Sequence, residues 1–209
     1  MVSCIALQEM VLHILESWCN MLCAIDIDGV LNDYPDCWVN YLNEALETDY
    51  ADLNEAKANV PFAVYNYAKE KYRSSGIKEM LPVKPNAKQL MRILKTYGYI
   101  IVIMTSRPIY QNQKVFEQTV RWLKKNGLPY DDLFFTDKKN MTIAKYFPDI
   151  DFVIEDNRKN ANEIAAMGKM VFLVNNKYNQ GETLPLVTRV NDLEEICEII
   201  VEVNENAGK

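Results

Sequence analysis

Short apolar runs alternate along the chain with longer segments that mix apolar and polar residues. The runs cover residues 22–27, 99–104, 133–136, 152–154 and 170–174. Such short runs, rich in Val, Ile and Leu, are typical of strands buried on both faces, because helices usually need about ten residues or more. The pattern therefore predicts a strand at each run.

The segments between these runs place apolar residues at helical spacing, about every third or fourth position. Strands that alternate with helices favour a mostly parallel sheet with helices on both faces, which is an α/β, Rossmann-like fold. In such a sheet, ligands bind at the carboxyl ends of the strands. The predicted helices cover residues 38–47, 64–73, 86–97, 116–126, 142–146, 159–167 and 192–203.

Length and composition indicate a single domain over residues 1–209, because 209 residues with 49% hydrophobic content can bury one sizeable core. Residues 33–85 are rich in Tyr, Trp, Asn, Ala and charge, and they are predicted to form a small helical cap inserted after the first strand. The aromatic residues of this cap could line a substrate pocket. Packing is favoured, because Trp38 with Tyr41, and Phe62 with Tyr65, have the spacing of a helical core face. Residues 1–20 are predicted to form an N-terminal helical extension.

Charge and cysteine content narrow the class of partner. A net charge of -6 argues against an extended surface that binds nucleic acid, so an anionic substrate must be bound by a few local residues. The 5 cysteines lack the spacing of a metal site, which favours reduced thiols.

No apolar run approaches the length of a membrane span, which is about 20 residues. The first segment also lacks the Lys or Arg residues with which a secretory signal begins. We expect a cytoplasmic protein with no membrane partner.

Acidic residues follow two of the predicted strands. Asp26 and Asp28 flank Ile27 at the end of the first apolar run, and strand alternation predicts that both carboxylates point into one pocket. Two close carboxylates repel each other, and a divalent cation relieves this repulsion. Glu155 and Asp156 follow residues 152–154 and could complete the site. Because hard oxygen ligands suit Mg²⁺, the sequence predicts a magnesium site.

Hydroxyl and basic residues follow two other strands. Thr105 and Ser106 offer hydroxyl and backbone N–H groups to phosphoryl oxygens, while Lys138 or Lys139 adds a positive charge. With a cation neutralising the carboxylates, one Asp could attack phosphorus to form an aspartyl-phosphate while another moves the proton. The set therefore predicts phosphoryl transfer that depends on positioning and electrostatics.

The order of these motifs resembles the haloacid dehalogenase superfamily of phosphohydrolases. The resemblance spans residues 22 to about 203 and implies the fold expected above. An acidic residue at position 28 favours hydrolysis of phosphate esters over dehalogenation. The motifs stand in this chain as Asp-Ile-Asp-Gly-Val-Leu at residues 26–31, Thr-Ser-Arg-Pro at 105–108, Lys-Lys at 138–139 and Glu-Asp-Asn at 155–157.

The resemblance also implies a role for each site residue. Asp26 would be the nucleophile and a Mg²⁺ ligand, and Asp28 would be the general acid and base and offer its backbone carbonyl to the metal. Lys138, which directly follows Asp137, is the preferred motif lysine over Lys139. The remaining implied roles are phosphoryl binding by Thr105 and Ser106, orientation of the nucleophile by Lys138 or Lys139, direct Mg²⁺ coordination by Asp156, and coordination through water by Glu155.

Within the superfamily, the chain resembles the nucleotidase-like subgroup that includes the 5'(3')-deoxyribonucleotidases. The signs are residues 104–108 (Met-Thr-Ser-Arg-Pro), the segment 119–123, and Tyr178-Asn179 before Arg189-Val190. This resemblance implies a small phosphorylated substrate, a nucleoside monophosphate above all.

Two other functions fit the same motifs less well. A 3'-phosphatase acting on nucleic-acid ends would share this core, but the acidic balance and the lack of a basic patch argue against it. A binding or regulatory protein that keeps the fold without turnover would be expected to lose Asp26 or Asp28, and both are present.

Overall fold

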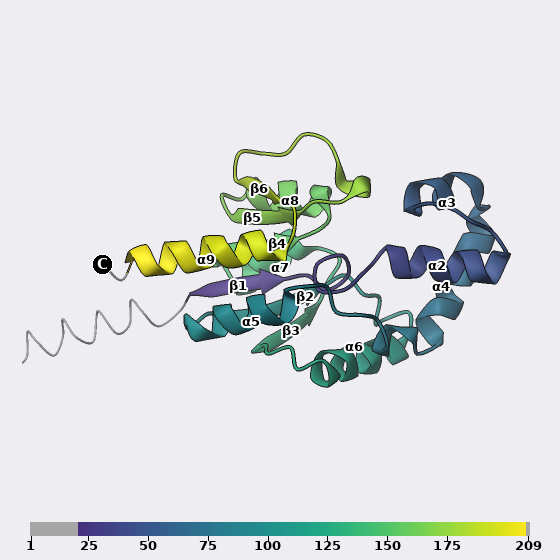
Figure 1. Cartoon of the computed structure of the whole chain (residues 1–209), viewed down its shortest axis with the longest axis horizontal. Helices are drawn as coiled ribbons and strands as arrows, with labels where there is room; N and C mark the ends of the chain where they lie inside the picture. Colours follow the sequence, from purple (N-terminus) through teal and green to yellow (C-terminus); the bar gives the residue numbers. More distant parts are fainter. Residues whose placement is uncertain (1–20, 208–209) are drawn as a thin grey trace, which may run out of the picture.

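A computed structural model describes residues 21–207, so the helical extension predicted for residues 1–20 lies outside the described residues. The sheet has six parallel strands in the order β3-β2-β1-β4-β5-β6 (Figure 1). The α/β, Rossmann-like fold predicted from the sequence is confirmed. The strands are β1 (Leu22–Ile25), β2 (Ile100–Thr105), β3 (Asp132–Phe135), β4 (Phe152–Glu155), β5 (Met170–Val174) and β6 (Val187–Val190).

Strand β1 lies at the centre of the sheet, where the strand order reverses. Ala24 pairs with Val102 of β2 on one side and with Val153 of β4 on the other. The chain then adds strands outward in both directions, and this reversal opens a crevice beyond the carboxyl ends of the central strands. The residues that end β1, β2 and β4 therefore meet at one place.

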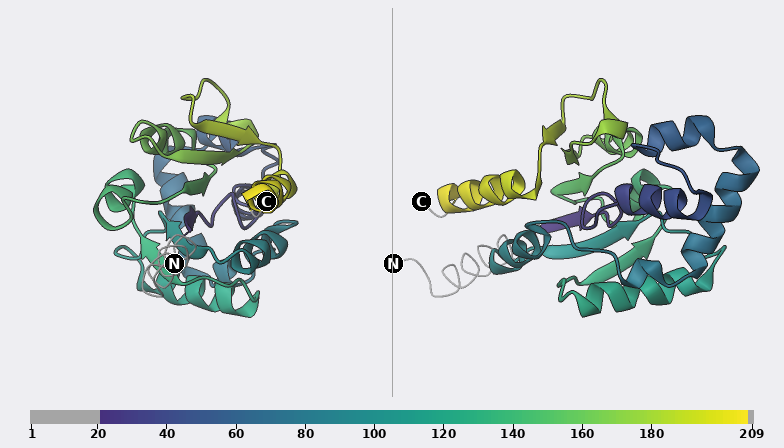
Figure 2. Two further views of the ribbon diagram at one scale, coloured as in Figure 1. Left: turned by 90° about the vertical axis from the view of Figure 1, so that its left-hand side faces the viewer. Right: turned by 45° about the vertical axis from the view of Figure 1, so that its right-hand side comes forward.

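Helices cover both faces of the sheet (Figure 2). On one face, Ile25 belongs to a core that includes Leu90, Trp122 and Ile196. On the other face, Ala24 packs in a second core with partners such as Ile143, Ala161 and Ile164. The helices are α5 (Ala87–Thr96), α6 (Gln113–Lys125) and α9 (Leu193–Ala207) for the first core, and α7 (Lys139–Tyr146) and α8 (Arg158–Ala165) for the second.

Between β1 and α5 the chain leaves the sheet and forms helices that lie beyond the carboxyl ends of the strands (Figure 1). We call this set the inserted helices. They have a small core of their own, in which Trp38 is fully buried and its ring centroid lies 5.2 Å from that of Tyr72. Phe62 is instead 81% exposed. The inserted helices are α2 (Asp36–Leu46), α3 (Leu53–Asn59), α4 (Phe62–Ser74) and the 3-10 turn η1 (Ile77–Glu79).

The two connections to the inserted helices run side by side. Asn32 and Val83 form an antiparallel bridge, and the Lys84 backbone N–H donates to the Leu31 carbonyl at 2.9 Å. The Lys84 side chain also donates to the Gly29 carbonyl at 2.7 Å. The chain thus enters and leaves the inserted helices through one narrow paired junction.

The sequence pattern missed helix α3 and strand β6, and also the 3-10 turns η1 and η2 (Lys177–Asn179). Helix α3 has only 7 residues, and it is stabilised at its start by the Asp52 carboxylate, which accepts from the backbone N–H groups of Asn54 and Glu55. Strand β6 is an edge strand of 4 residues, in which Val187 and Val190 are buried and Thr188 is exposed. Both are too short for a periodic pattern to emerge. None of the helices in the described part of the chain is long and apolar enough to cross a membrane.

Replacing Trp122 by Ala should lower the free energy of unfolding by about 3–5 kcal/mol. The ring is fully buried, and its Nε1 donates to the Leu81 carbonyl at 2.7 Å. Urea unfolding followed by circular dichroism measures the change. Phe116→Ala on the same helix is the control, because Phe116 is 45% exposed, and it should cost about 1 kcal/mol or less. Equal losses from the two substitutions would contradict the assignment of Trp122 to the core.

Candidate active site

Three buried carboxylates meet at the ends of β1 and β4. Asp26 follows β1, and its backbone N–H donates to the Ile154 carbonyl of β4 at 3.0 Å. This pairing brings Asp26 next to Glu155 and Asp156, and one carboxylate oxygen from each of the three lies within 4.8 Å of the others. The first and last predicted motifs are therefore neighbours in space.

Lys139 neutralises part of this acidic cluster. Its Nζ lies 3.0 Å from Asp26 Oδ1 and 2.5 Å from Glu155 Oε2, and its side chain is buried. Lys138 is exposed and stands at the N-cap of α7, whereas Lys139 is the first helical residue. The change of backbone conformation sends the two side chains in different directions. The geometry favours Lys139, although the sequence favoured Lys138.

The charges in this cluster are incompletely balanced. Burial raises the pKa of Asp26 to about 7, and the Glu155 and Asp28 charges add to this rise while Lys139 opposes it. Burial and the charges of Asp26 and Glu155 also raise the pKa of Asp156 well above its usual range. Three mutually repelling carboxylates beside a single lysine form an arrangement that a cation would stabilise.

The donor set fits a hard divalent cation. Asp26 Oδ1 is buried and, although near Lys139 Nζ, accepts no well-aligned hydrogen bond from the described residues. Carboxylate oxygens of this kind suit Mg²⁺. Glu155 is more fully occupied, because Oε1 accepts from the Asn157 backbone at 3.1 Å and from the Asn160 side chain at 3.2 Å. Asp26 and Asp156 are thus the carboxylates with free capacity for a metal.

The carboxylate of Asp28 is not part of this cluster. It accepts from Arg107 Nη2 at 2.6 Å and Nε at 3.0 Å, from Lys78 at 3.2 Å and from the Asn32 side chain at 2.8 Å. Burial alone would raise the pKa of Asp28, but the charges of Arg107 and Lys78 outweigh it and hold the pKa well below the usual range. Asp28 is therefore a carboxylate anion held by two cations.

The turn after β1 explains why Asp26 and Asp28 diverge. The strand ends at Ile25, so the alternation of side chains does not extend to Asp28. Gly29 follows with a φ of +89°, and a Cβ there would lie 2.1 Å from Asp156 Oδ2. Only glycine fits such a close approach. Both carboxylates still line one cavity, of about 280 Å³.

Thr105 ends β2 and Ser106 follows it, and both line the same cavity. Thr105 is buried, and its Oγ1 accepts weakly from the Arg107 backbone N–H at 3.4 Å. Ser106 is exposed, and its hydroxyl donates to the Thr136 carbonyl at 3.0 Å. The structure thus brings together all the predicted site residues except Lys138, with Thr105 the more enclosed of the two hydroxyls.

Sequence reasoning gave too little weight to Arg107 and overlooked Lys78. Arg107 was named only as part of the Thr-Ser-Arg-Pro motif and was assigned no role of its own, yet it is 3% exposed and also donates to Thr119 Oγ1 at 3.0 Å. Its place directly after Thr105-Ser106 was the available signal. Lys78 comes from η1 and is buried, and nothing in the local pattern marks it. Tyr178, which hydrogen-bonds to Asp156, was noted only as a family sign.

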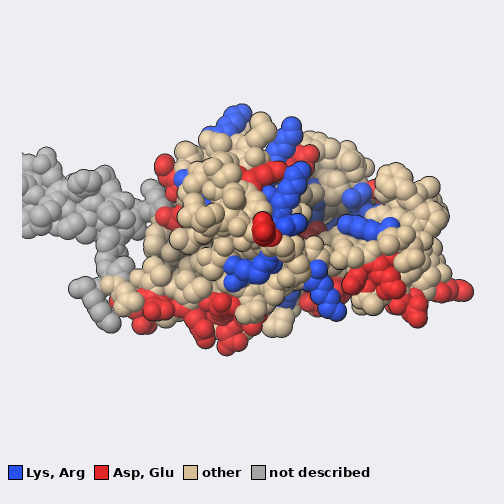
Figure 3. Space-filling model, turned by 90° about the horizontal axis from the view of Figure 1, so that it is seen from above, with Lys and Arg blue, Asp and Glu red and all other residues tan. Residues whose placement is uncertain are grey.

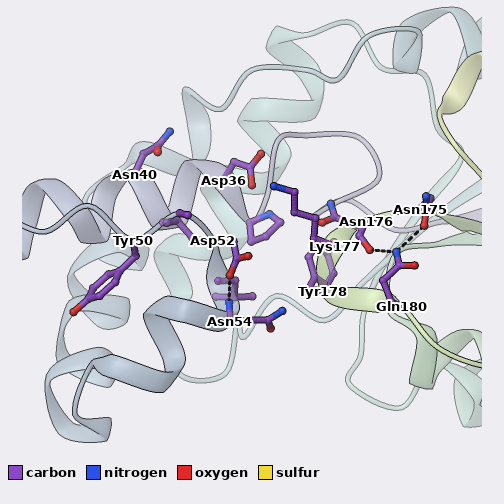
Figure 4. Close-up of a pocket in the computed structure, with 14 residues that line it drawn as sticks. Asp36, Asn40, Tyr50, Asp52, Asn54, Asn175, Asn176, Lys177, Tyr178 and Gln180 are labelled. Atoms are coloured by element: carbon purple, nitrogen blue, oxygen red, sulfur yellow. Dashed lines mark hydrogen bonds between the residues drawn. The ribbon is translucent and has the colours of Figure 1, made fainter.

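A second hollow, of about 820 Å³, adjoins the cavity and shares Leu53 and Tyr178 with it (Figure 4). It lies between α2 and α3 on one side and the segment around η2 (Lys177–Asn179) on the other. Its lining offers many neutral hydrogen-bonding groups, among them the side chains of Asn40, Asn54, Asn175, Asn176 and Gln180.

The fold and the motif order together define a phosphatase of the haloacid dehalogenase superfamily, as the sequence predicted. Residues 20–205 match the model of the family described as 5' nucleotidase, deoxy (pyrimidine), cytosolic type C protein, and the chain belongs to this family. The resemblance to nucleotidases is thereby confirmed.

Individual relatives agree with this placement. A nucleotidase of Clostridium acetobutylicum is 26% identical over 192 residues, which cover 84% of this chain and 91% of that protein. A haloacid dehalogenase-like hydrolase of Streptococcus pneumoniae has a TM-score of 0.57 at 14% identity, covering 88% of this chain and 99% of that one. D,D-heptose 1,7-bisphosphate phosphatase of B. bronchiseptica, solved with magnesium and phosphate, has a TM-score of 0.56 at 15% identity, covering 87% and 98%. The two structures share the fold with this chain.

Replacing Lys139 by Met should lower the free energy of unfolding by about 3–5 kcal/mol, because Asp26 and Glu155 would be left buried without their cation. Urea unfolding of the wild type, Lys139→Met and Lys138→Met measures the change. Lys138→Met is the matched control, since its side chain is exposed. If both variants unfolded at the wild-type midpoint, the buried ion pair would not contribute to the stability of the fold.

Proposed function

We propose that the protein is a Mg²⁺-dependent phosphomonoesterase that hydrolyses nucleoside monophosphates through an aspartyl-phosphate on Asp26. The observation that carries this proposal is the buried cluster of Asp26, Glu155 and Asp156 with Lys139 on Asp26. It supplies a nucleophile, a set of metal ligands and a fixed positive charge at the end of the central strands. Family membership supports the same reaction class.

In this proposal Asp26 and Asp156 would hold Mg²⁺ directly, with the backbone carbonyl of Asp28, and Glu155 would act through water. When bound, the cation neutralises the carboxylates and polarises the phosphoryl oxygens, which lets an anionic nucleophile approach an anionic ester.

The chain's own residues supply the remaining chemistry. Asp26 attacks phosphorus while the bond to the ester oxygen breaks, and Asp28 donates the proton that this oxygen needs. Asp28 then takes a proton from the water that cleaves the aspartyl-phosphate. Lys139 orients Asp26, and Thr105 with Ser106 binds the transferring phosphoryl group.

The proposed role of Asp28 requires a change in its partners. While Arg107 and Lys78 hold it, its low pKa makes it a poor proton donor. We propose that the phosphate of the substrate draws Arg107 away, since Arg binds phosphate through the same paired N–H groups that it uses for carboxylates. The loss of one cation would raise the pKa of Asp28 toward the range of a general acid.

A nucleoside is supported as the leaving group by family membership and by the second hollow. The neutral amide groups around that hollow can hydrogen-bond a base or a sugar (Figure 4). Tyr178 and Leu53 border both spaces, so a molecule with its phosphate near Asp26 could extend between them. The family description, a cytosolic nucleotidase, supports a cytoplasmic location.

Phosphate release from a panel of nucleoside monophosphates, sugar phosphates and a 3'-phosphorylated oligonucleotide tests this function. With Mg²⁺, release from a nucleoside monophosphate should exceed that from the oligonucleotide, and a chelator should abolish it. Asp26→Asn should lower kcat by about a thousandfold or more while the protein stays folded. Asp137→Asn is the control, because Asp137 is exposed and next to the lysine pair. Turnover retained by Asp26→Asn would overturn the nucleophile.

A further inference from the structure

The inserted helices bring three more cations to the active-site cavity. Lys57 of α3 and Lys69 and Arg73 of α4 line it together with the strand-end residues. Seen from above, Lys and Arg side chains gather around the hollow between the sheet and the inserted helices, while Asp and Glu dominate the lower edge of the view (Figure 3). In a chain of net charge -6, this concentration of positive charge is a local feature.

Lys69 is the most unusual of the three. Its Nζ lies 4.0 Å from the centre of the Trp38 ring and 4.7 Å from that of Tyr34, and it donates to the Tyr34 hydroxyl at 3.4 Å. Within residues 21–207, no carboxylate lies at ion-pair distance from it. Burial, then the charge of Lys78, lowers the pKa of Lys69 well below its usual range. A half-buried ammonium without a counter-charge is costly unless an anion joins it.

The neighbouring cations are also available to a ligand. Lys57 is exposed and has no ion pair among the described residues. In the part of the chain that the structure describes, Arg73 pairs only with Glu70, whose side chain is 50% exposed, and such surface pairs are weak. A guanidinium and two ammonium groups on one wall are the donors that phosphate groups attract.

Lys57, Lys69 and Arg73 are not needed to balance the catalytic carboxylates. Lys139 lies against Asp26 and Glu155, and Arg107 and Lys78 hold Asp28. The proposed reacting phosphoryl group lies at the strand ends, beside Thr105 and Lys139. Lys57, Lys69 and Arg73 therefore carry positive charge that neither the catalytic carboxylates nor one phosphate at the strand ends uses.

We propose that Lys57, Lys69 and Arg73 form a second anion subsite, and that the substrate carries a second phosphate group besides the one removed. The inference rests on the proposed hydrolase and revises its substrate, because the preferred ester would carry two phosphate groups where a nucleoside monophosphate carries one. The strand-end residues bind the phosphate that leaves, and the cations of the inserted helices bind the one that stays.

Calorimetric titration of the Asp26→Asn protein with Mg²⁺ tests the subsite without turnover. The probes are adenosine 5'-monophosphate against adenosine 3',5'-bisphosphate, and fructose 6-phosphate against fructose 1,6-bisphosphate. In at least one pair, the bisphosphate should bind about tenfold more tightly or better, as expected for one or two added charge-assisted hydrogen bonds.

Three substitutions in the same background locate the effect. Lys69→Met and Lys57→Gln should each reduce the advantage of the bisphosphate to about threefold or less, with little change in monophosphate binding. Lys71→Gln is the matched control, because Lys71 is on α4 but points away, over the Tyr67 ring, and it should keep the full advantage. Lys57 is exposed, so Lys57→Gln serves even if Lys69→Met fails to fold.

Equal affinity within both pairs of probes would overturn the subsite, as would an advantage that survives Lys69→Met and Lys57→Gln in folded protein. Mg²⁺-dependent hydrolysis of monophosphates by the wild type would in that case still support the proposed function. A bisphosphate advantage that depends on these lysines, in a wild-type protein that hydrolyses no ester, would keep the subsite and refute the hydrolase.

Discussion

The arrangement of the site depends on one buried lysine. Lys139 starts α7 and reaches across to Asp26 after β1 and Glu155 at the end of β4, so a single side chain connects a helix with two adjacent strands. Taking these charges out of water is costly, and their mutual attraction only partly offsets the cost. The excess negative charge that remains would favour the binding of a cation at this point.

Much of the architecture follows from local sequence. The apolar runs at 22–27 and 99–104 are long enough to identify buried strands, and a parallel sheet then requires that the polar residues after them share one edge. Asp26, Thr105 and Asp156 were placed in this way. Side-chain directions that are set by a turn or a helix start could not be predicted in this way. Asp28 does not follow the alternation of a strand, because the strand ends at Ile25. Lys139 differs from its neighbour Lys138 only in being the first helical residue.

Contacts between distant segments were the hardest to foresee. Lys78 and Lys69 come from the inserted helices, and no periodic pattern links them to residues of the sheet. Arg107 lies 5.9 Å over the Trp122 ring, so the position of a site cation depends partly on the core packing of α6. The pairing of positive and negative side chains across the cavity thus depends on tertiary contacts. The sequence alone shows only that the net charge of the chain is negative.

The narrow junction at Asn32 and Val83 has a mechanical consequence. Both connections of the inserted helices pass through it, and a second set of contacts attaches these helices to α6: Gln118 donates to the Arg73 carbonyl at 3.0 Å, and Arg121 donates to Glu79 at 2.9 Å. Asp28 lies on the sheet side of the junction, whereas Lys78, one of the two cations that hold its carboxylate, lies on the other side. Two separate attachments therefore fix the distance between Lys78 and Asp28. The low pKa of Asp28 thus depends on how the inserted helices are attached, and not on the sheet alone.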